Sequence, residues 1–230
     1  SGAAKSLSGA YLAARQADLE RDYRVSEQYY TRAVHQDPNN PVLMERLIMA
    51  HMSLGQFAAA SPVAQRLDAQ QVDSQLVNMM QIATGAEQGQ YDSILQRIDQ
   101  GKGIGALIDR LLVAWAITGQ GRMSDALKAF DEVAKKQGVE AFARYHKALA
   151  LAHAGDFESA AEIFEQTVQA GIRLTRRGVI AQIQVLSQLD LDDQAIAVLD
   201  LNFDASVDPE ISNLRQRLSA GETLDFSIVR

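Results

Sequence analysis

Apolar residues along this chain recur at the spacing of short helices, and the pattern returns at a fixed period. The clearest block, Gly155–Phe164, reads GDFESAAEIF, and Gly121–Phe130, thirty-four residues earlier, reads GRMSDALKAF. In both blocks an apolar residue follows the glycine by two positions, an alanine by five and a phenylalanine by nine. Looser copies begin at Gly55 and Gly89. Self-similarity at a fixed period indicates stacked copies of one supersecondary unit.

Six helical hairpins account for this pattern. Each consists of a first helix, helix A, a tight turn, and a second helix, helix B, which carries the repeated block. Pro38 and its polar neighbours end the first hairpin, and Pro41 suits the first helical position of the second. The six units are expected near residues 7–40, 41–74, 75–104, 105–138, 139–172 and 173–202. Residues 1–6 are interpreted as a tail or cloning scar, and residues 203–230 as a further helix and tail that lead into more repeats of a longer protein.

The residues at the turns set the register of the units. Tyr23, Phe57 and Tyr91 are each thirty-four positions apart, and so are Met123 and Phe157. We therefore expect them at the same place in five units. The spacing shortens to thirty-two across residues 101–105, GKGIG, which we expect to form a flexible connector.

Composition favours an all-helical protein and limits its function. Hydrophobic residues make up 47% of the chain and aromatic residues 6%, and runs typical of strands are scarce. The net charge of −7 argues against a nucleic-acid partner, which needs a basic surface. No apolar run reaches the roughly 18 residues of a membrane span. The absence of cysteine excludes disulfides, thiolate catalysis and cysteine-based zinc sites.

Three groups of residues resemble chemical sites, and each has a simpler interpretation. His146 and His153 lie seven positions apart, whereas a helical metal pair prefers four. The glycines of residues 101–105 lack the spacing of a phosphate-binding loop. The acidic turn at residues 190–193 lacks the glycine and closing glutamate of a calcium loop. We therefore predict no catalytic residue, no metal and no cofactor.

Charge is unevenly distributed near the end of the chain. Arg173, Arg176 and Arg177 form a basic cluster, and residues 190–210 hold seven acidic residues without lysine or arginine. These charges form either a solvated surface or an electrostatic contact with a partner or a second copy.

The repeated block resembles the tetratricopeptide repeat, a helix-turn-helix unit of thirty-four residues. Gly155, Phe157, Ala160 and Phe164 match its turn and helix B positions. The third and sixth units depart from it, because Ile94 replaces the helix B alanine and the sixth turn has no glycine. The resemblance implies an all-α, right-handed superhelical solenoid of about six repeats, with a concave groove lined mainly by the A helices.

The family pattern also implies which side chains face that groove. The main candidates for partner binding are Tyr11, Arg15, Met49, Met52, Met79, Leu111, Trp115 and Tyr145. The same mapping adds Asp18, Glu45, Ala83, Phe142, Leu149, Arg177 and Gln184. Methionine and aromatic side chains suit adaptable apolar contacts. Trp115 belongs either to the groove or to the core.

The resemblance implies a non-catalytic scaffold or adaptor that binds a protein or peptide of unknown identity in its groove. One alternative is a self-assembling structural module. Another is the helical body of a larger enzyme whose catalytic domain lies elsewhere. The segments SGAYLAARQA, LVAWAITGQGR and ARYHKALALAHAGDFESA are similar to an exported alphaproteobacterial group of such proteins. We therefore expect a periplasmic protein whose signal peptide has been removed, with the cytoplasm as the alternative location.

Overall fold

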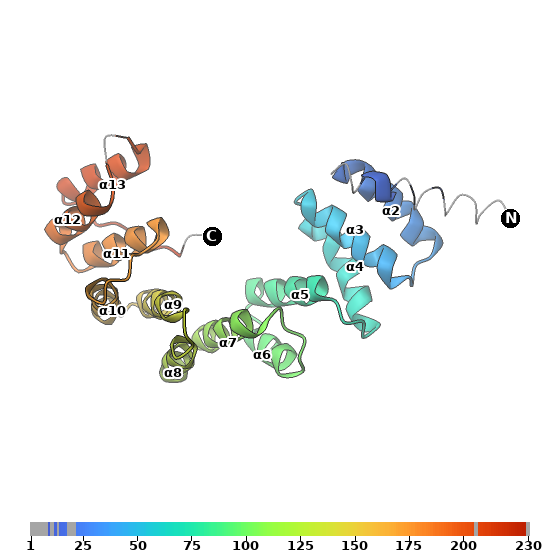
Figure 1. Cartoon of the computed structure of the whole chain (residues 1–230), viewed down its shortest axis with the longest axis horizontal. Helices are drawn as coiled ribbons and strands as arrows, with labels where there is room; N and C mark the ends of the chain where they lie inside the picture. Colours follow the sequence, from blue (N-terminus) through green and yellow to red (C-terminus); the bar gives the residue numbers. More distant parts are fainter. Residues whose placement is uncertain (1–8, 10–11, 13, 18–21, 205–206, 229–230) are drawn as a thin grey trace. The chain divides into compact units, whose positions relative to one another are not determined.

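The computed structural model describes residues 9, 12, 14–17, 22–204 and 207–228. Within these residues the regular secondary structure is entirely helical (Figure 1). The helices are α2 (Tyr23–Gln36), α3 (Pro41–Ser53), α4 (Phe57–Ala69), α5 (Gln75–Glu87), α6 (Tyr91–Asp99), α7 (Ala106–Gly119), α8 (Met123–Ala134), α9 (Glu140–His153), α10 (Phe157–Gln169), α11 (Arg176–Gln188), α12 (Asp192–Asn202) and α13 (Pro209–Ser219). The prediction of an all-α fold is confirmed. None of the described helices is long and apolar enough to cross a membrane.

The chain divides into two compact units, Ser1–Asp109 (unit 1) and Arg110–Arg230 (unit 2). In unit 1, helices that follow one another along the chain pack together from α2 to α6. In unit 2, the same neighbour-on-neighbour packing runs from α8 to α13. A single hairpin cannot cover its own apolar face, so stacking on the next hairpin supplies the core.

Small residues allow these helices to approach closely, and large residues fill the space between them. Ala126 and Phe130 of α8 have no exposed surface, and in α10 Ala160 and Phe164 are buried in the same way. The alanine and phenylalanine of the repeated block are therefore core positions.

The turn between helices A and B requires a left-handed backbone conformation. Gly155 adopts it with φ of +86°, where a side chain would be strained. The sixth hairpin lacks this glycine, but Asp190 adopts the same conformation with φ of +58°. Aspartate tolerates this region better than most residues, so the sixth hairpin forms without the family glycine.

The glycine-rich connector is anchored, which differs from the flexible link that we expected. The Asp109 carboxylate accepts hydrogen bonds from the amides of Ile104 (2.7 Å) and Gly105 (3.3 Å). Gln75 donates to the Ile104 carbonyl oxygen at 2.6 Å. A Cβ atom on Gly103 would lie 2.1 Å from the Asp109 carboxylate, so the lack of a side chain allows this close approach. Polar side chains of α5 and α7 fix the connector, and the glycine spacing alone does not reveal them.

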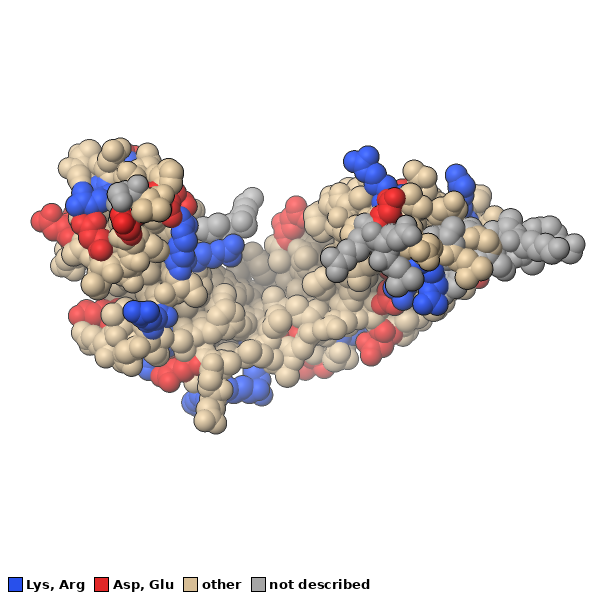
Figure 2. All heavy atoms as spheres, turned by 45° about the horizontal axis from the view of Figure 1, so that its top comes forward, with Lys and Arg blue, Asp and Glu red and all other residues tan. Residues whose placement is uncertain are grey.

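Charged side chains of both signs are mixed on the face of the molecule in Figure 2. Basic side chains do not gather there into a continuous stripe.

Candidate functional site

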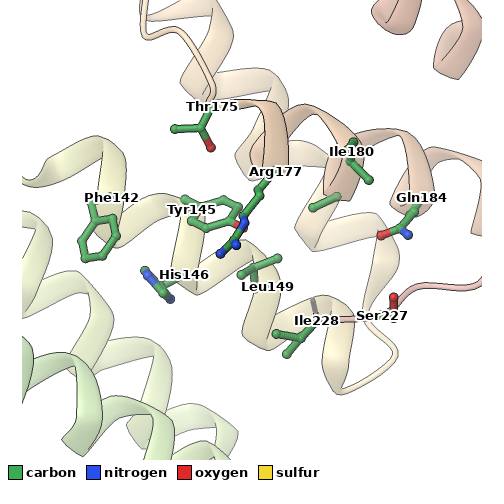
Figure 3. Close-up of a pocket in the computed structure, with 11 residues that line it drawn as sticks. Phe142, Tyr145, His146, Leu149, Thr175, Arg177, Ile180, Gln184, Ser227 and Ile228 are labelled. Atoms are coloured by element: carbon green, nitrogen blue, oxygen red, sulfur yellow. The ribbon is translucent and has the colours of Figure 1, made fainter. Parts of the chain in front are cut away.

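Unit 2 contains a pocket of about 320 Å³ between α9 and α11, which we call the α9–α11 pocket. Its lining residues come from two consecutive A helices and from the segment after α13, as Figure 3 shows. They are Phe142, Tyr145, His146, Leu149, Thr175, Arg177, Ile180, Ala181, Gln184, Ser227 and Ile228. Five of them, Phe142, Tyr145, Leu149, Arg177 and Gln184, are positions that the family pattern assigns to the groove.

An aromatic cluster supports the α9 wall of this pocket. The His146 ring contacts Phe142 edge to face, with ring centroids 4.5 Å apart, and Tyr145 at 5.3 Å. Behind it, Trp115 of α7 packs edge to face on Phe130 of α8 with ring centroids 5.7 Å apart. Edge-to-face pairs of this kind add about 0.5–1.5 kcal/mol beyond the burial of their area. Trp115 is half-buried and does not line the pocket, so it acts as a support for the wall.

A hydrogen bond fixes the protonation state of His146. The Trp115 indole N–H donates to His146 Nδ1 at 3.0 Å. An indole nitrogen only donates, so Nδ1 accepts and the imidazole proton sits on Nε2. Burial also lowers the pKa of His146 below its ordinary value, because the charged ring is poorly solvated there. His146 is therefore a neutral acceptor at pH 7.

We expect this histidine to make unit 2 sensitive to acid. In the unfolded chain His146 titrates near 6.5, and in the folded chain its pKa is lower. The unfolded chain then binds more protons as pH falls below about 6.5, so stability is full above that pH and is lost as pH falls through the folded pKa. Urea titrations followed by fluorescence of Trp115, the single tryptophan, between pH 7.5 and 5 measure this loss.

The variant His146→Asn is the control, since its amide oxygen lies near the Nδ1 position and does not titrate. We expect it to remove the part of the acid sensitivity that comes from His146. Equal losses of stability in both proteins between pH 7.5 and 5 would contradict this assignment.

The other end of the α9–α11 pocket is polar and positively charged. Arg177 is exposed, and its guanidinium group lies close to the Tyr145 ring in Figure 3. Among the described residues no ion pair involves Arg177, whereas its neighbour Arg176 pairs with Asp208 at 2.9 Å and Glu210 at 2.7 Å. Part of the basic cluster thus meets the acidic region within unit 2 itself. Arg177 stays available beside apolar walls, an arrangement suited to an apolar side chain next to a carboxylate.

Unit 1 contains a second pocket of about 590 Å³, which we call the α4–α5 pocket. Its lining is apolar and rich in methionine, with one carboxylate at the rim. The residues are Met52, Phe57, Ala58, Ser61, Met79, Met80, Ala83, Thr84, Glu87 and Gln88. Phe57 is 61% exposed and Met79 40% exposed, which are large values for apolar side chains. Exposed apolar surface of this kind is typical of interaction sites.

The sequence-predicted groove residues lie in different surroundings. Tyr11 and Asp18 are outside the described residues, and Arg15 is exposed. Tyr145 lines the α9–α11 pocket, and Met52 and Met79 line the α4–α5 pocket, so the candidates separate between the two units.

The remaining candidates belong to neither pocket. Met49 is 48% exposed on α3. Leu111 is 6% exposed, so its side chain lies in the interior.

Four lining residues have a place that the sequence does not predict, namely His146, Phe57, Ser227 and Ile228. The sequence suggests His146 only as a metal ligand and Phe57 only as a register residue. Ser227 and Ile228 lie far along the chain from the helices that they meet. A signal is present in the sequence, because Leu224, Phe226 and Ile228 alternate with the polar residues Asp225 and Ser227, a spacing typical of an extended segment with one apolar side. Among the described residues, no group of histidine, aspartate and glutamate side chains is placed to hold a metal ion.

Comparison with known families finds the tetratricopeptide repeat twice. Two family profiles with that description match residues 19–81 and 118–173, which together are just over half of the chain. No curated protein matches the sequence.

Several solved structures share the fold. MamA (residues 41 to the end) from Desulfovibrio magneticus RS-1 has a TM-score of 0.56 and 13% identity, covering 71% of this chain and 94% of that one. PilF of Pseudomonas aeruginosa has a TM-score of 0.55 and 12% identity, covering 96% and 100%. YrrB, a tetratricopeptide-repeat protein described as having an unusual peptide-binding site, has a TM-score of 0.54 and 13% identity, covering 68% and 81%. At these identities the likeness concerns the fold alone.

Proposed function

We propose that this chain, which belongs to the tetratricopeptide-repeat proteins, is a non-catalytic scaffold or adaptor that binds a protein or peptide partner on its A helices. Proteins of this fold commonly mediate such interactions, and the description of YrrB names a peptide-binding site in one of them. The α9–α11 pocket is the observation that carries the proposal. Two successive A helices supply its walls, and its size suits one or two side chains of a bound chain.

The chemistry of the pocket indicates how a partner is held. Phe142 is 47% exposed and offers apolar surface, and the largely buried Leu149 and Ile180 complete an apolar lining. Apolar lining of this kind is typical of binding pockets. Arg177 adds a cation without a carboxylate partner among the described residues. A partner segment therefore matches both the apolar lining and the cation if it places an apolar side chain between the helices and a carboxylate on Arg177. The fixed neutral state of His146 keeps the wall uncharged at pH 7.

The proposal also includes a periplasmic location, with the cytoplasm as the alternative. It is supported by the similarity of three segments to an exported bacterial group. This similarity lies in the residues of those segments and does not depend on where the sequence begins or ends. Fractionation of the native cells, followed by immunodetection in the periplasmic and cytoplasmic fractions, separates the two locations.

A pull-down with matched variants tests the binding role. The full chain recovers its partner from native cells, and mass spectrometry identifies it. We expect the double variant Phe142→Ala, Tyr145→Ala to reduce recovery of that partner at least tenfold while its circular dichroism stays helical. Leu201, which is 83% exposed and not part of the pocket lining, provides the control variant Leu201→Ala, which should bind normally. Unchanged recovery with the double variant would refute the proposal.

A further inference from the structure

Unit 2 already holds a bound segment, which is part of its own chain. Residues 222–228 follow α13 without helical structure and return to α11. The Leu224 amide donates to Ser187 Oγ at 2.9 Å, and the Leu224 carbonyl oxygen accepts from Gln188 Nε2 at 2.6 Å. Both backbone groups of Leu224 are thus bound by side chains of one A helix. The Leu224 side chain is itself fully buried.

Phe226 is the aromatic anchor of this segment. Its ring meets Phe157 edge to face, with centroids 6.2 Å apart. It packs against the cluster that includes Ala152 of α9 and Ala181 and Val185 of α11. Phe157 is consequently half-buried, although it is the first residue of its helix.

The repeat register identifies the same place in unit 1. Helices α4 and α10 both have 13 residues and begin 100 positions apart. Helices α5 and α11 both have 13 residues and begin 101 positions apart. The left-handed residues that follow them, Gly89 and Asp190, are also 101 positions apart. Phe157 and the cluster residues on which Phe226 packs therefore have counterparts in unit 1.

Four of these counterparts line the α4–α5 pocket. Phe57 corresponds to Phe157, and Met52 to Ala152. In the following A helix, Met80 corresponds to Ala181 and Thr84 to Val185. All four unit 1 residues belong to the pocket lining. The part of unit 1 that corresponds to the cluster on which Phe226 packs in unit 2 therefore contains a pocket, and Phe57 is 61% exposed there.

We propose that the α4–α5 pocket binds an aromatic side chain carried by a non-helical segment of a partner protein, as unit 2 binds Phe226. This inference rests on the proposed function, because it assigns a chemistry to one of the surfaces of a binding module. The ring lies edge to face on Phe57, between Met52 and Met80. Methionine sulfur makes favourable contacts with aromatic rings, and unit 1 offers three methionines where unit 2 has smaller or branched residues.

The rim of the pocket sets the charge of the partner segment. Glu87 stands at the position of Gln188, which donates to the backbone in unit 2. A carboxylate only accepts, so Glu87 binds a backbone N–H or a basic side chain next to the ring. At this position Glu87 would repel the carbonyl oxygen that Gln188 binds in unit 2, and the chain's own segment adds a second negative charge, Asp225, next to Phe226. The rim thus favours a partner with lysine or arginine beside the aromatic residue over the tail of a second copy.

Two synthetic peptides distinguish these occupants. One has the sequence of residues 222–228, ETLDFSI, and the other replaces its aspartate by lysine, ETLKFSI. In fluorescence anisotropy titrations with the full chain we expect the lysine peptide to bind at least fivefold more tightly. Replacing its phenylalanine by alanine should abolish binding. Glu87→Gln should remove most of the preference for lysine.

Variants of the two equivalent phenylalanines locate the peptide. Phe57→Ala, at a position that is 61% exposed, should weaken binding of the lysine peptide at least tenfold, whereas Phe157→Ala should leave it unchanged. In the intact chain, methyl NMR signals of Met52, Met79 and Met80 should shift on binding, and that of Met123 should not.

Three outcomes overturn the proposal: no binding of either peptide, binding insensitive to Phe57→Ala, or loss of binding only in Phe157→Ala. Tighter binding of the aspartate peptide, together with dimers in light scattering, assigns the pocket to a second copy and also refutes it. The pull-down with Phe142 and Tyr145 variants concerns the α9–α11 pocket in unit 2. A failed peptide titration therefore leaves the proposed function standing, and a failed pull-down does not remove a Phe57-dependent peptide signal.

Discussion

Replacing Phe164 by alanine is expected to lower the free energy of unfolding of unit 2 by about 3–5 kcal/mol. Phe164 is 1% exposed. It belongs to a core cluster with Ala160 of the same helix and with residues of α9 and α11. The substitution loses the apolar transfer free energy of the ring and leaves a cavity, because the small alanines around it have no atoms with which to fill the space. Urea unfolding followed by circular dichroism measures the change.

Phe142→Ala is the matched control for this prediction. Its ring is 47% exposed on α9, so only the edge-to-face contact with His146 and part of the buried area are lost. We expect a loss of about 0.5–1.5 kcal/mol, as for one aromatic pair. A smaller effect at Phe164 than at Phe142 would show that the repeated block does not form the core of its unit.

The fold could be predicted because its signal is local and repeated. The alanine and phenylalanine of each block sit on one face of helix B, and every unit must bury that face on its neighbour. Ala160 and Phe164 therefore carry the same information as Ala126 and Phe130. The sixth hairpin departs from the pattern at its turn, yet Asp190 adopts the required left-handed conformation. A single substitution at a turn does not undo a pattern that the neighbouring units impose.

The candidate site was predicted only in part, since its surroundings depend on contacts distant in sequence. Tyr145, Leu149 and Arg177 follow from the family spacing and line one pocket. The same spacing also selects Leu111, whose side chain is buried. Spacing along one helix shows which residues share a face, but it does not show whether another segment covers that face.

The segment 222–228 illustrates this limit most clearly. Its position on unit 2 depends on hydrogen bonds between Leu224 and two residues of α11, Ser187 and Gln188, which are 37 and 36 positions away in the sequence. The local sequence pattern of α11 does not indicate that its side chains bind the backbone of another segment. The connector at residues 101–105 is similar, because Asp109 decides its conformation from outside the glycine run.

Replacing Asp68 by alanine is expected to lower the free energy of unfolding of unit 1 by about 2–3 kcal/mol, the second largest effect that we predict. The Arg97 guanidinium donates to both Asp68 carboxylate oxygens, at 2.8 and 3.1 Å, and to Asn78 Oδ1 at 3.0 Å. This network joins α4, α5 and α6. The Arg97 side chain is only 14% exposed, so removing the carboxylate leaves a poorly solvated cation.

The pH dependence of this pair has a definite sign. The hydrogen bonds from Arg97 lower the pKa of Asp68 below its ordinary value, with a smaller contribution from the charge of Lys102. The unfolded carboxylate titrates near 3.9. The stabilisation is therefore present above that pH and is lost as pH falls through the lower, folded pKa. At neutral pH the substitution shows its full effect.

Two further variants separate the buried charge from the lost side chain. Asp125→Ala removes the partner of Arg122 in a surface pair whose side chains are 56% and 46% exposed, and exposed pairs of this kind contribute about 0–1 kcal/mol. The double variant Asp68→Ala, Arg97→Met removes both charges and keeps an apolar chain in the same space. We expect it to be more stable than Asp68→Ala alone, because the cost of the single variant lies mainly in the uncompensated cation. The double variant could instead lose as much stability as the single variants Asp68→Ala and Arg97→Met lose together. In that case Arg97 contributes through packing between the helices, and its charge has little role.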